Sequence, residues 1–146
     1  MNVVSVYDEP EGLRVLWALL RERSTESDPH TNISHREMPT WEAHCKHVKA
    51  RPHIGWWLLH DGREWLGAVH VTDRNEIGIA LFRKHRGQGY GAKAVRWVLD
   101  NVKPRRAVKG RRRGTFVANI NPHNERSIRL FEGLGFKHVQ NTYVLE

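Results

Sequence analysis

Three glycines stand within five residues at the point where an apolar segment of this chain gives way to an amphipathic one. The apolar segment, Glu76 to Phe82, reads EIGIALF, and RKHRGQGYGA follows it directly. Beyond the glycines, apolar residues recur at helical spacing, at Val95, Val98, Leu99 and Val102. The pattern predicts a strand, a glycine-rich loop and a helix in immediate succession.

A loop of this kind is suited to binding an anion. Glycines let the backbone turn so that several N–H groups point inward, and the start of the helix adds about half a positive charge. Arg83, Lys84 and Arg86 lie beside the glycines and strengthen the attraction. A pyrophosphate fits such a loop best. The alternative is a surface loop whose glycines only make a turn.

Two known phosphate-binding loops do not match. A Walker loop ends in Gly-Lys-Ser or Gly-Lys-Thr, whereas this chain has Gly91-Ala92-Lys93-Ala94. Gly87, Gly89 and Ala92 have the spacing of a dinucleotide fingerprint, but residues 83–86 separate them from the strand. Basic residues stand at 109–113, where that fingerprint expects an acid. The sequence therefore argues against a nicotinamide-dependent enzyme.

The remaining elements are short and suggest one α+β domain spanning residues 1–146. Asp8, Thr40 and Asn124 are each placed to cap a helix. Strands are expected at 3–7, 54–60, 64–72, 76–82, 115–121 and 136–145, with a tight hairpin turn at Asp61-Gly62. The expected order is β-α-α-β-β-β-α-β-α-β, which forms a mixed, mostly antiparallel sheet flanked by helices.

Positive charge is concentrated in one part of the chain. The net charge is +8, and residues 83–113 hold twelve Lys or Arg and one acid, Asp100. This excess predicts an anionic partner, such as a cofactor phosphate, a nucleic acid or an acidic surface. Seven of the basic residues lie in the segment 103–113, which has no aromatic residue for base stacking. A nucleic acid is therefore the less favoured partner.

Several classes of protein are not expected. No stretch approaches the roughly 20 apolar residues that cross a bilayer, and the N-terminus does not resemble a secretory signal, so we expect a cytoplasmic protein without membrane partners. Cys45 is the single cysteine, which excludes an internal disulfide. His44 and His47 lie near it, but no further ligand follows at zinc spacing, so no metal is expected.

Two motifs together resemble the GNAT superfamily of N-acetyltransferases, which use acetyl-CoA. The first is Arg-x-x-Gly-x-Gly, formed by Arg86, Gly89 and Gly91. The second runs from Asn121-Pro-His-Asn124 through Ser127 to Phe131 and is followed by Leu134-Gly135-Phe136. The likeness covers residues 54–146 well, and residues 1–53 only through their β-α-α pattern. It implies a GNAT-like fold.

The resemblance also implies a function and a cofactor site. The chain would be an acyltransferase that moves an acetyl group from acetyl-CoA, without a metal, to a primary amine by direct attack in a ternary complex. Amides of the glycine loop would hold the pyrophosphate, and the end of the preceding strand would hold the pantetheine. The implied cofactor-binding residues are Leu81, Phe82, Arg83, Arg86, Gly87, Gln88, Gly89, Tyr90, Gly91, Ala92, Asn121, Asn124 and Ser127.

The acceptor remains open at this stage. A small amine is favoured, with an amino sugar or a sugar nucleotide as an example, and the enzyme would be a monomer or homodimer. The alternatives are a protein or ribosomal N-terminus, or a non-enzymatic basic module that binds nucleic acid. Trp41, Trp56, Trp57 and Trp65 are expected in the core, with an aromatic wall for the acceptor as the alternative.

The catalytic residues are less defined by the resemblance. An amine must lose a proton before or during attack, and Glu76 is the first candidate for the base, ahead of His70 and Asp73. Many family members carry a tyrosine acid at the position of Phe131, which is expected here to be a core residue. Tyr143 or a water molecule would replace that acid, or the thiolate would leave without one.

Overall fold

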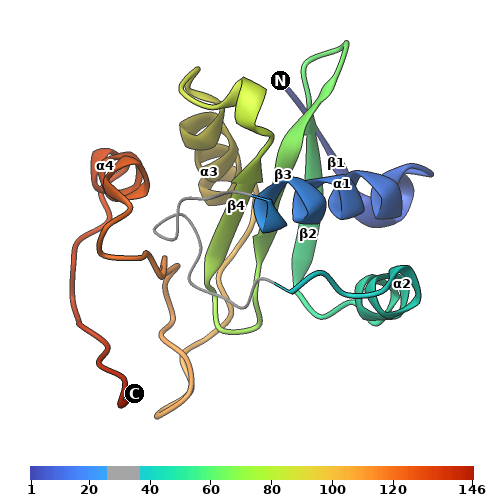
Figure 1. Cartoon of the computed structure of the whole chain (residues 1–146). Coiled ribbons are helices and arrows are strands. Elements are labelled where there is room, and N and C mark those ends of the chain that lie inside the picture. Colours follow the sequence, from blue (N-terminus) through green and yellow to red (C-terminus); the bar gives the residue numbers. More distant parts are fainter. Residues whose placement is uncertain (26–36) are drawn as a thin grey trace.

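In the part of the chain that the computed structural model describes, residues 1–25 and 37–146, four antiparallel strands form one sheet (Figure 1). The strands are β1 (Asn2–Ser5), β2 (Gly55–His60), β3 (Trp65–Val71) and β4 (Ile77–Leu81), and they lie in this order. Together with the flanking helices they confirm the predicted α+β class.

The turns of the sheet follow from local chemistry. The Asp61 carboxylate accepts hydrogen bonds from the amides of Arg63 (2.8 Å) and Glu64 (2.7 Å), and Gly62 has a φ of 99°. The predicted Asp61-Gly62 turn between β2 and β3 is thereby confirmed. Asn75 has a φ of 65° in the turn between β3 and β4, a conformation that asparagine adopts more readily than most residues.

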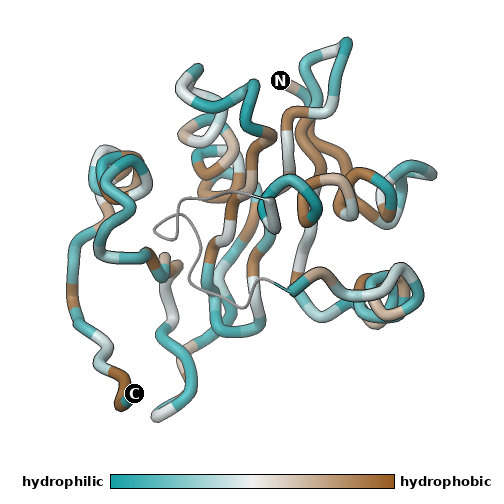
Figure 2. Tube along the Cα trace, viewed as in Figure 1, coloured by the Kyte–Doolittle hydropathy of each residue, from teal (hydrophilic) through white to brown (hydrophobic). Residues whose placement is uncertain are grey.

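Helices cover both faces of the sheet. On one face α1 (Gly12–Ser24) and α2 (Trp41–Lys49) pack against strand residues that include Leu58 and Ala68. On the other face α3 (Tyr90–Asn101) and α4 (Glu125–Gly133) bury Val69 and Ile77. Figure 2 shows the hydrophobic residues gathered along the strands and on the helices beside them. Two separate apolar cores result.

The predicted caps are confirmed for two helices and wrong for a third. The Thr40 hydroxyl accepts from the Ala43 amide (3.1 Å), and the Asn124 side chain accepts from the Ser127 amide (3.2 Å). Asp8 instead ends a short 3-10 turn, η1 (Val6–Asp8), and α1 starts only at Gly12. The chain needs this extra turn because Gly12 packs directly on the backbone of Val6.

The last two predicted strands are not formed. Residues 115–121 make one parallel bridge to the sheet, between Val117 and Glu76, and residues 136–146 belong to no strand. Tyr143 is 89% exposed, and Val144 and Leu145 are exposed as well. A segment forms a stable strand only where it pairs with other strands, and this tail lies apart from the sheet in Figure 1.

A buried asparagine ties the segment after α3 to the sheet. Asn75 is 0% exposed, and its side-chain amide donates to the carbonyls of Arg105 (2.9 Å) and Arg113 (2.8 Å). Its side-chain oxygen accepts from the Arg105 amide (2.8 Å). One side chain thus fixes both ends of the basic segment beside the β3–β4 turn.

We predict that Asn75→Ala lowers the free energy of unfolding by about 3 kcal/mol, because three buried hydrogen bonds at about 1 kcal/mol each are lost. Asn75→Gly should be less destabilising by about 1 kcal/mol, since glycine accepts a positive φ without strain. Urea unfolding measures both values. A glycine variant as stable as the unchanged chain would show that the side-chain bonds contribute nothing.

Candidate active site

The register of the sheet leaves part of one strand edge unpaired. The Glu76 carbonyl accepts a hydrogen bond from the Thr72 amide (2.9 Å), and the Phe82 amide donates one to the Leu66 carbonyl (3.0 Å). Both residues therefore direct these groups toward β3. Bonding positions alternate along an antiparallel pair, so the backbone groups of Ile79 and Leu81 face away from β3.

The partner on that side is present only at the beginning of β4. The Ile77 amide donates to the Val117 carbonyl (2.8 Å), and the Val117 amide donates to the Asn75 carbonyl (3.0 Å). Within the described residues no further bridge continues this pairing. We call residues 78–81 the open edge of β4, because their outward backbone groups have no partner strand.

The glycine loop, residues 86–92, begins just beyond the open edge. Gly87 has a φ of 74°, and Gly89 has a φ of 85° and is the residue that precedes α3. The amides of residues 88–92 donate to no acceptor among the residues that the structure describes. A Cβ at Gly89 would meet nothing within 4 Å. The loop therefore presents a row of free donors at the positive end of a helix.

The last helix packs against this loop. A Cβ built at Gly91 would lie 2.6 Å from Cδ1 of Leu130, so the absence of a side chain lets α4 approach the start of α3. The N-terminal end of α4 carries the implied polar residues. The Asn124 side chain caps α4, and the Asn121 side chain accepts from the His123 amide (2.9 Å). The Ser127 hydroxyl has no hydrogen-bond partner within residues 1–25 and 37–146.

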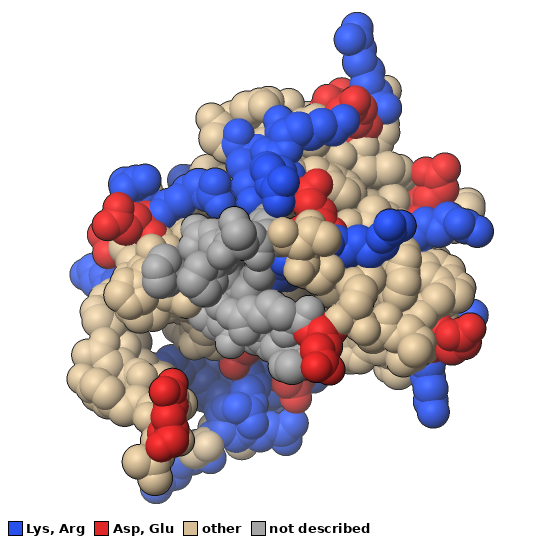
Figure 3. All heavy atoms as spheres, viewed as in Figure 1, with Lys and Arg blue, Asp and Glu red and all other residues tan. Residues whose placement is uncertain are grey.

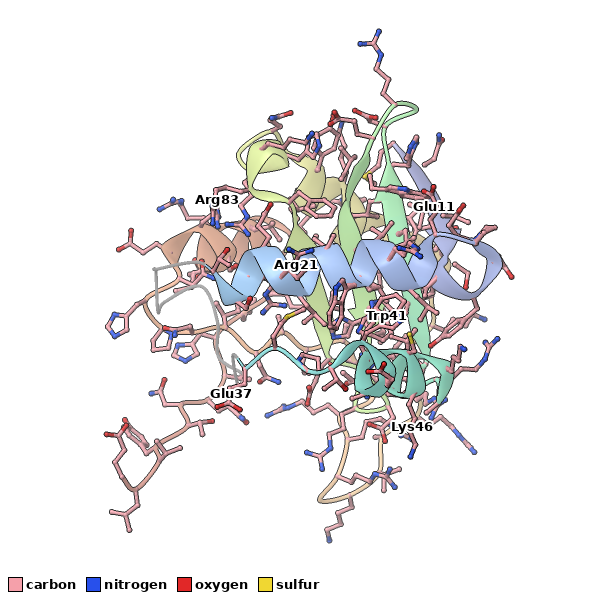
Figure 4. All side chains as sticks on the ribbon, turned by 45° about the vertical axis from the view of Figure 1, so that its right-hand side comes forward. Glu11, Arg21, Glu37, Trp41, Lys46 and Arg83 are labelled. Atoms are coloured by element: carbon pink, nitrogen blue, oxygen red, sulfur yellow. The ribbon has the colours of Figure 1, made fainter. Side chains whose placement is uncertain are left out.

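The basic residues next to the loop form hydrogen bonds and ion pairs with other groups of the protein. Arg86 Nε donates to the carbonyl of Leu81 (3.1 Å), and Lys84 Nζ pairs with the Glu64 carboxylate (3.0 Å). The Arg83 amide donates to the carboxylate of Glu22, and Figure 4 shows Arg83 beyond one end of α1. The backbone of Phe82 is engaged on both sides, because its carbonyl accepts from His85 (2.9 Å). Of the two strand-end residues implied, only Leu81 has an amide at the open edge.

The face of β4 that α1 and α2 cover carries a cluster of aromatic rings. We call this cluster the imidazole wall: His53, Trp56 and His70. A Cβ at Gly78 would lie 2.2 Å from the His70 ring, so His70 covers the strand at that glycine. His53 stacks on His70 with ring centres 4.2 Å apart and planes 17° apart, and Trp56 lies 5.9 Å from His70. His70 and Trp56 are cross-strand partners, which the sequence does not reveal without the register.

The wall is uncharged at neutral pH. Burial lowers the pKa of His70 to about 3, and the charges of His53 and Arg23 act in the same direction. Burial also lowers the pKa of His53, with a further contribution from His47 and an opposing one from Asp73. Sequence reasoning named His70 alone and missed His53, which stands outside any strand and gives no periodic signal.

The other catalytic candidates are spread over the molecule. Glu76 precedes β4 on the same strand face as Gly78 and is partly buried. Tyr143 lies in the exposed tail, and the structure does not bring it to the open edge. Phe131 is 4% exposed and packs on Phe136 at 5.1 Å, as expected of a core residue. Asp73 pairs with Arg111 (2.9 Å).

Two further properties of the described residues concern metal binding and membrane spanning. No three histidine, cysteine or acidic side chains gather there in an arrangement that could hold a metal ion. No described helix has the length and apolar character needed to cross a membrane.

Comparison with known proteins gives a family for this arrangement. Residues 4–137 match the family described as the acetyltransferase (GNAT) domain. An uncharacterized protein of Methanocaldococcus jannaschii is 32% identical over 62% of this chain. This chain spans only 21% of that protein's length.

Solved structures show the same fold. An N-acetyltransferase from Staphylococcus aureus superposes with a TM-score of 0.70 at 20% identity, over 95% of this chain and 84% of that one. Spermidine N-acetyltransferase from Vibrio cholerae, solved in complex with CoA and spermine, gives 0.69 at 17% identity, over 95% and 82%. With the glycine loop and the open edge of β4 in place, the chain belongs to the GNAT acetyltransferase family.

Proposed function

We propose that the protein transfers an acetyl group from acetyl-CoA to the primary amine of a small acceptor, by direct attack in a ternary complex. The row of free amides in the glycine loop, at the end of the open edge of β4, carries this proposal. The similar Vibrio cholerae enzyme, crystallised with CoA and spermine, supports a CoA donor and a small amine acceptor.

The loop and the strand end would hold the donor. Amides of Gln88, Gly89, Gly91 and Ala92 would donate to the pyrophosphate, with Gly87 and Tyr90 completing the loop and Arg83 adding positive charge. The amide and carbonyl of Ile79 and the amide of Leu81, all at the open edge, would form hydrogen bonds with the pantetheine. Acetyl-CoA supplies an acetyl thioester that an amine can attack. Asn121, Asn124 and Ser127 would line the pantetheine side from α4.

The imidazole wall would bind the acceptor. It lies on the face of β4 that α1 and α2 also cover, and its rings are uncharged at neutral pH. Neutral rings offer a stacking surface with polar edges, which suits a sugar better than a polycation. We therefore propose an amino sugar or a sugar nucleotide as the acceptor.

Glu76 would take the proton that the acceptor amine must lose. Its carboxylate is on the strand face of Gly78, the glycine that His70 covers, so the base and the wall share one side of β4. His70 would position the acceptor rather than accept its proton, because a pKa of about 3 makes its ring a weak base.

Gly89→Ala should weaken acetyl-CoA binding at least about tenfold, because a side chain at positive φ disturbs the row of amides. Gly62→Ala is the matched control: Gly62 also has a positive φ (99°) and open space around its Cβ, but lies in the β2–β3 turn. Isothermal titration calorimetry measures both affinities. If the two variants bind acetyl-CoA equally well, the loop is not the donor site.

Glu76→Gln should lower kcat/KM by about a hundredfold and remove the acidic limb of its pH profile, as expected when a general base is lost. His70→Gln should raise KM for the acceptor more than it lowers kcat. Initial rates with amino sugars, sugar nucleotides, polyamines and N-terminal peptides provide the measurement. An unchanged pH profile in Glu76→Gln would eliminate Glu76 as the base, and ping-pong kinetics would eliminate direct attack.

The stability of the protein should fall as the pH is lowered from about 6.5 toward 3. The pKa of His70 lies at about 3 in the fold, below its ordinary value of 6.5, so the unfolded chain binds a proton that the fold resists. Urea midpoints at pH 7 and pH 4.5 test this. The fall should be smaller in His70→Gln. An equal fall in this variant and in the unchanged protein would contradict a buried neutral ring.

A further inference from the structure

The basic segment after α3 is an ordered hairpin. Residues 103–113, which we call the basic prong, fold back on themselves through an antiparallel bridge between Val108 and Arg112. The Arg111 and Arg112 amides both donate to the Val108 carbonyl at 2.9 Å, and Gly110 has a φ of 75° at the turn. The prong therefore has a defined backbone shape.

The base of the prong is fastened to the sheet. Asn75 bonds the backbone of Arg105 and Arg113, as described above. Arg112 donates to the carbonyls of Arg106 (2.7 Å) and Asp73 (2.9 Å), while Arg111 pairs with the Asp73 carboxylate (2.9 Å). Two of the seven cations thus serve to hold the prong in place.

The other cations of the prong point into solvent. They are Lys103, Arg105, Arg106, Lys109 and Arg113, all exposed, and their side chains pair with no group among the described residues. Figure 3 shows Lys and Arg atoms gathered at the lower edge of the molecule, where Figure 1 draws this segment. Holding like charges together on a fixed scaffold costs free energy unless an anionic partner neutralises them.

The prong lies too far from the glycine loop to contribute to the binding of acetyl-CoA. It is fastened at the β3–β4 turn, whereas the glycine loop follows the opposite end of β4. Phe82 follows Glu76 by six steps of extended chain, which is about 20 Å at 3.3 Å per residue. Charges that far apart are screened at physiological salt. The partner of the prong must be a different anion.

From this geometry we infer that the basic prong binds the phosphate backbone of a double-stranded nucleic acid. Guanidinium groups predominate in it, and these bind phosphate oxygens in bidentate fashion. The prong has no aromatic side chain on which unpaired bases could stack. A protein partner would require apolar anchors, and the prong exposes one, Val108, at 42%. Contacts to the phosphate groups of a duplex require neither aromatic side chains nor apolar anchors.

The test compares two triple variants of the whole chain that remove the same charge. The first changes Arg106, Lys109 and Arg113 to Ser, which keeps the fastening residues Arg111 and Arg112. The control changes Lys46, Lys49 and Arg63 to Ser, all exposed, with Lys46 on α2 in Figure 4. Fluorescence anisotropy measures binding to labelled duplex RNA, duplex DNA, single-stranded RNA and poly-glutamate over a range of salt concentrations.

We expect the unchanged protein and the control to bind a duplex with steep salt dependence. The prong variant should lose at least about tenfold in affinity at 0.1 M salt and about 2 in the salt slope. A preference between the RNA and DNA duplexes identifies the natural source of the phosphates. Equal losses in both variants, or stronger binding to single-stranded RNA or poly-glutamate than to either duplex, would overturn the inference. Affinity for acetyl-CoA should be the same in all three proteins, which separates this test from that of the proposed function.

Discussion

The hydrogen bonds that join β4 to β3 fix which backbone groups of β4 stay unpaired, and the site is arranged around those groups. One edge of the strand is paired with β3, while among the described residues the other edge has a backbone partner at Ile77 alone. Backbone groups without a partner strand can form hydrogen bonds with a ligand or with water, and this is why we propose the open edge as the binding surface for the donor. The glycine loop continues this surface with further free amides at the start of α3.

Positive charge is used differently at the two ends of α3. At its start lie the backbone amides of the glycine loop, while the Arg86 side chain is bonded to Leu81 and the Lys84 side chain to Glu64. Beyond its end, the basic prong keeps most of its side chains in solvent and has its backbone fastened by Asn75. The prong, with seven basic residues and no acid, therefore accounts for most of the net charge of +8.

Features that depend on neighbouring residues could be predicted from the sequence. The cap residues Thr40 and Asn124 and the Asp61-Gly62 turn act within a few residues, and the structure confirms all three. Predictions that needed a distant partner had mixed outcomes: Phe131 lies in the core as expected, whereas the last two predicted strands are not formed. The tail 136–145 is predicted as a strand but belongs to none, and Tyr143 lies in this exposed segment.

The sequence alone determined the glycine loop, the helix that follows it and the acetyltransferase family, because each depends on short motifs with fixed local conformations. Only the tertiary structure decided which residues face that loop and which do not. Asn75 bonds partners 30 and 38 positions away, and His70 meets His53 and Gly78 through the register of three strands. Such contacts depend on how distant segments pack, and no local pattern encodes them.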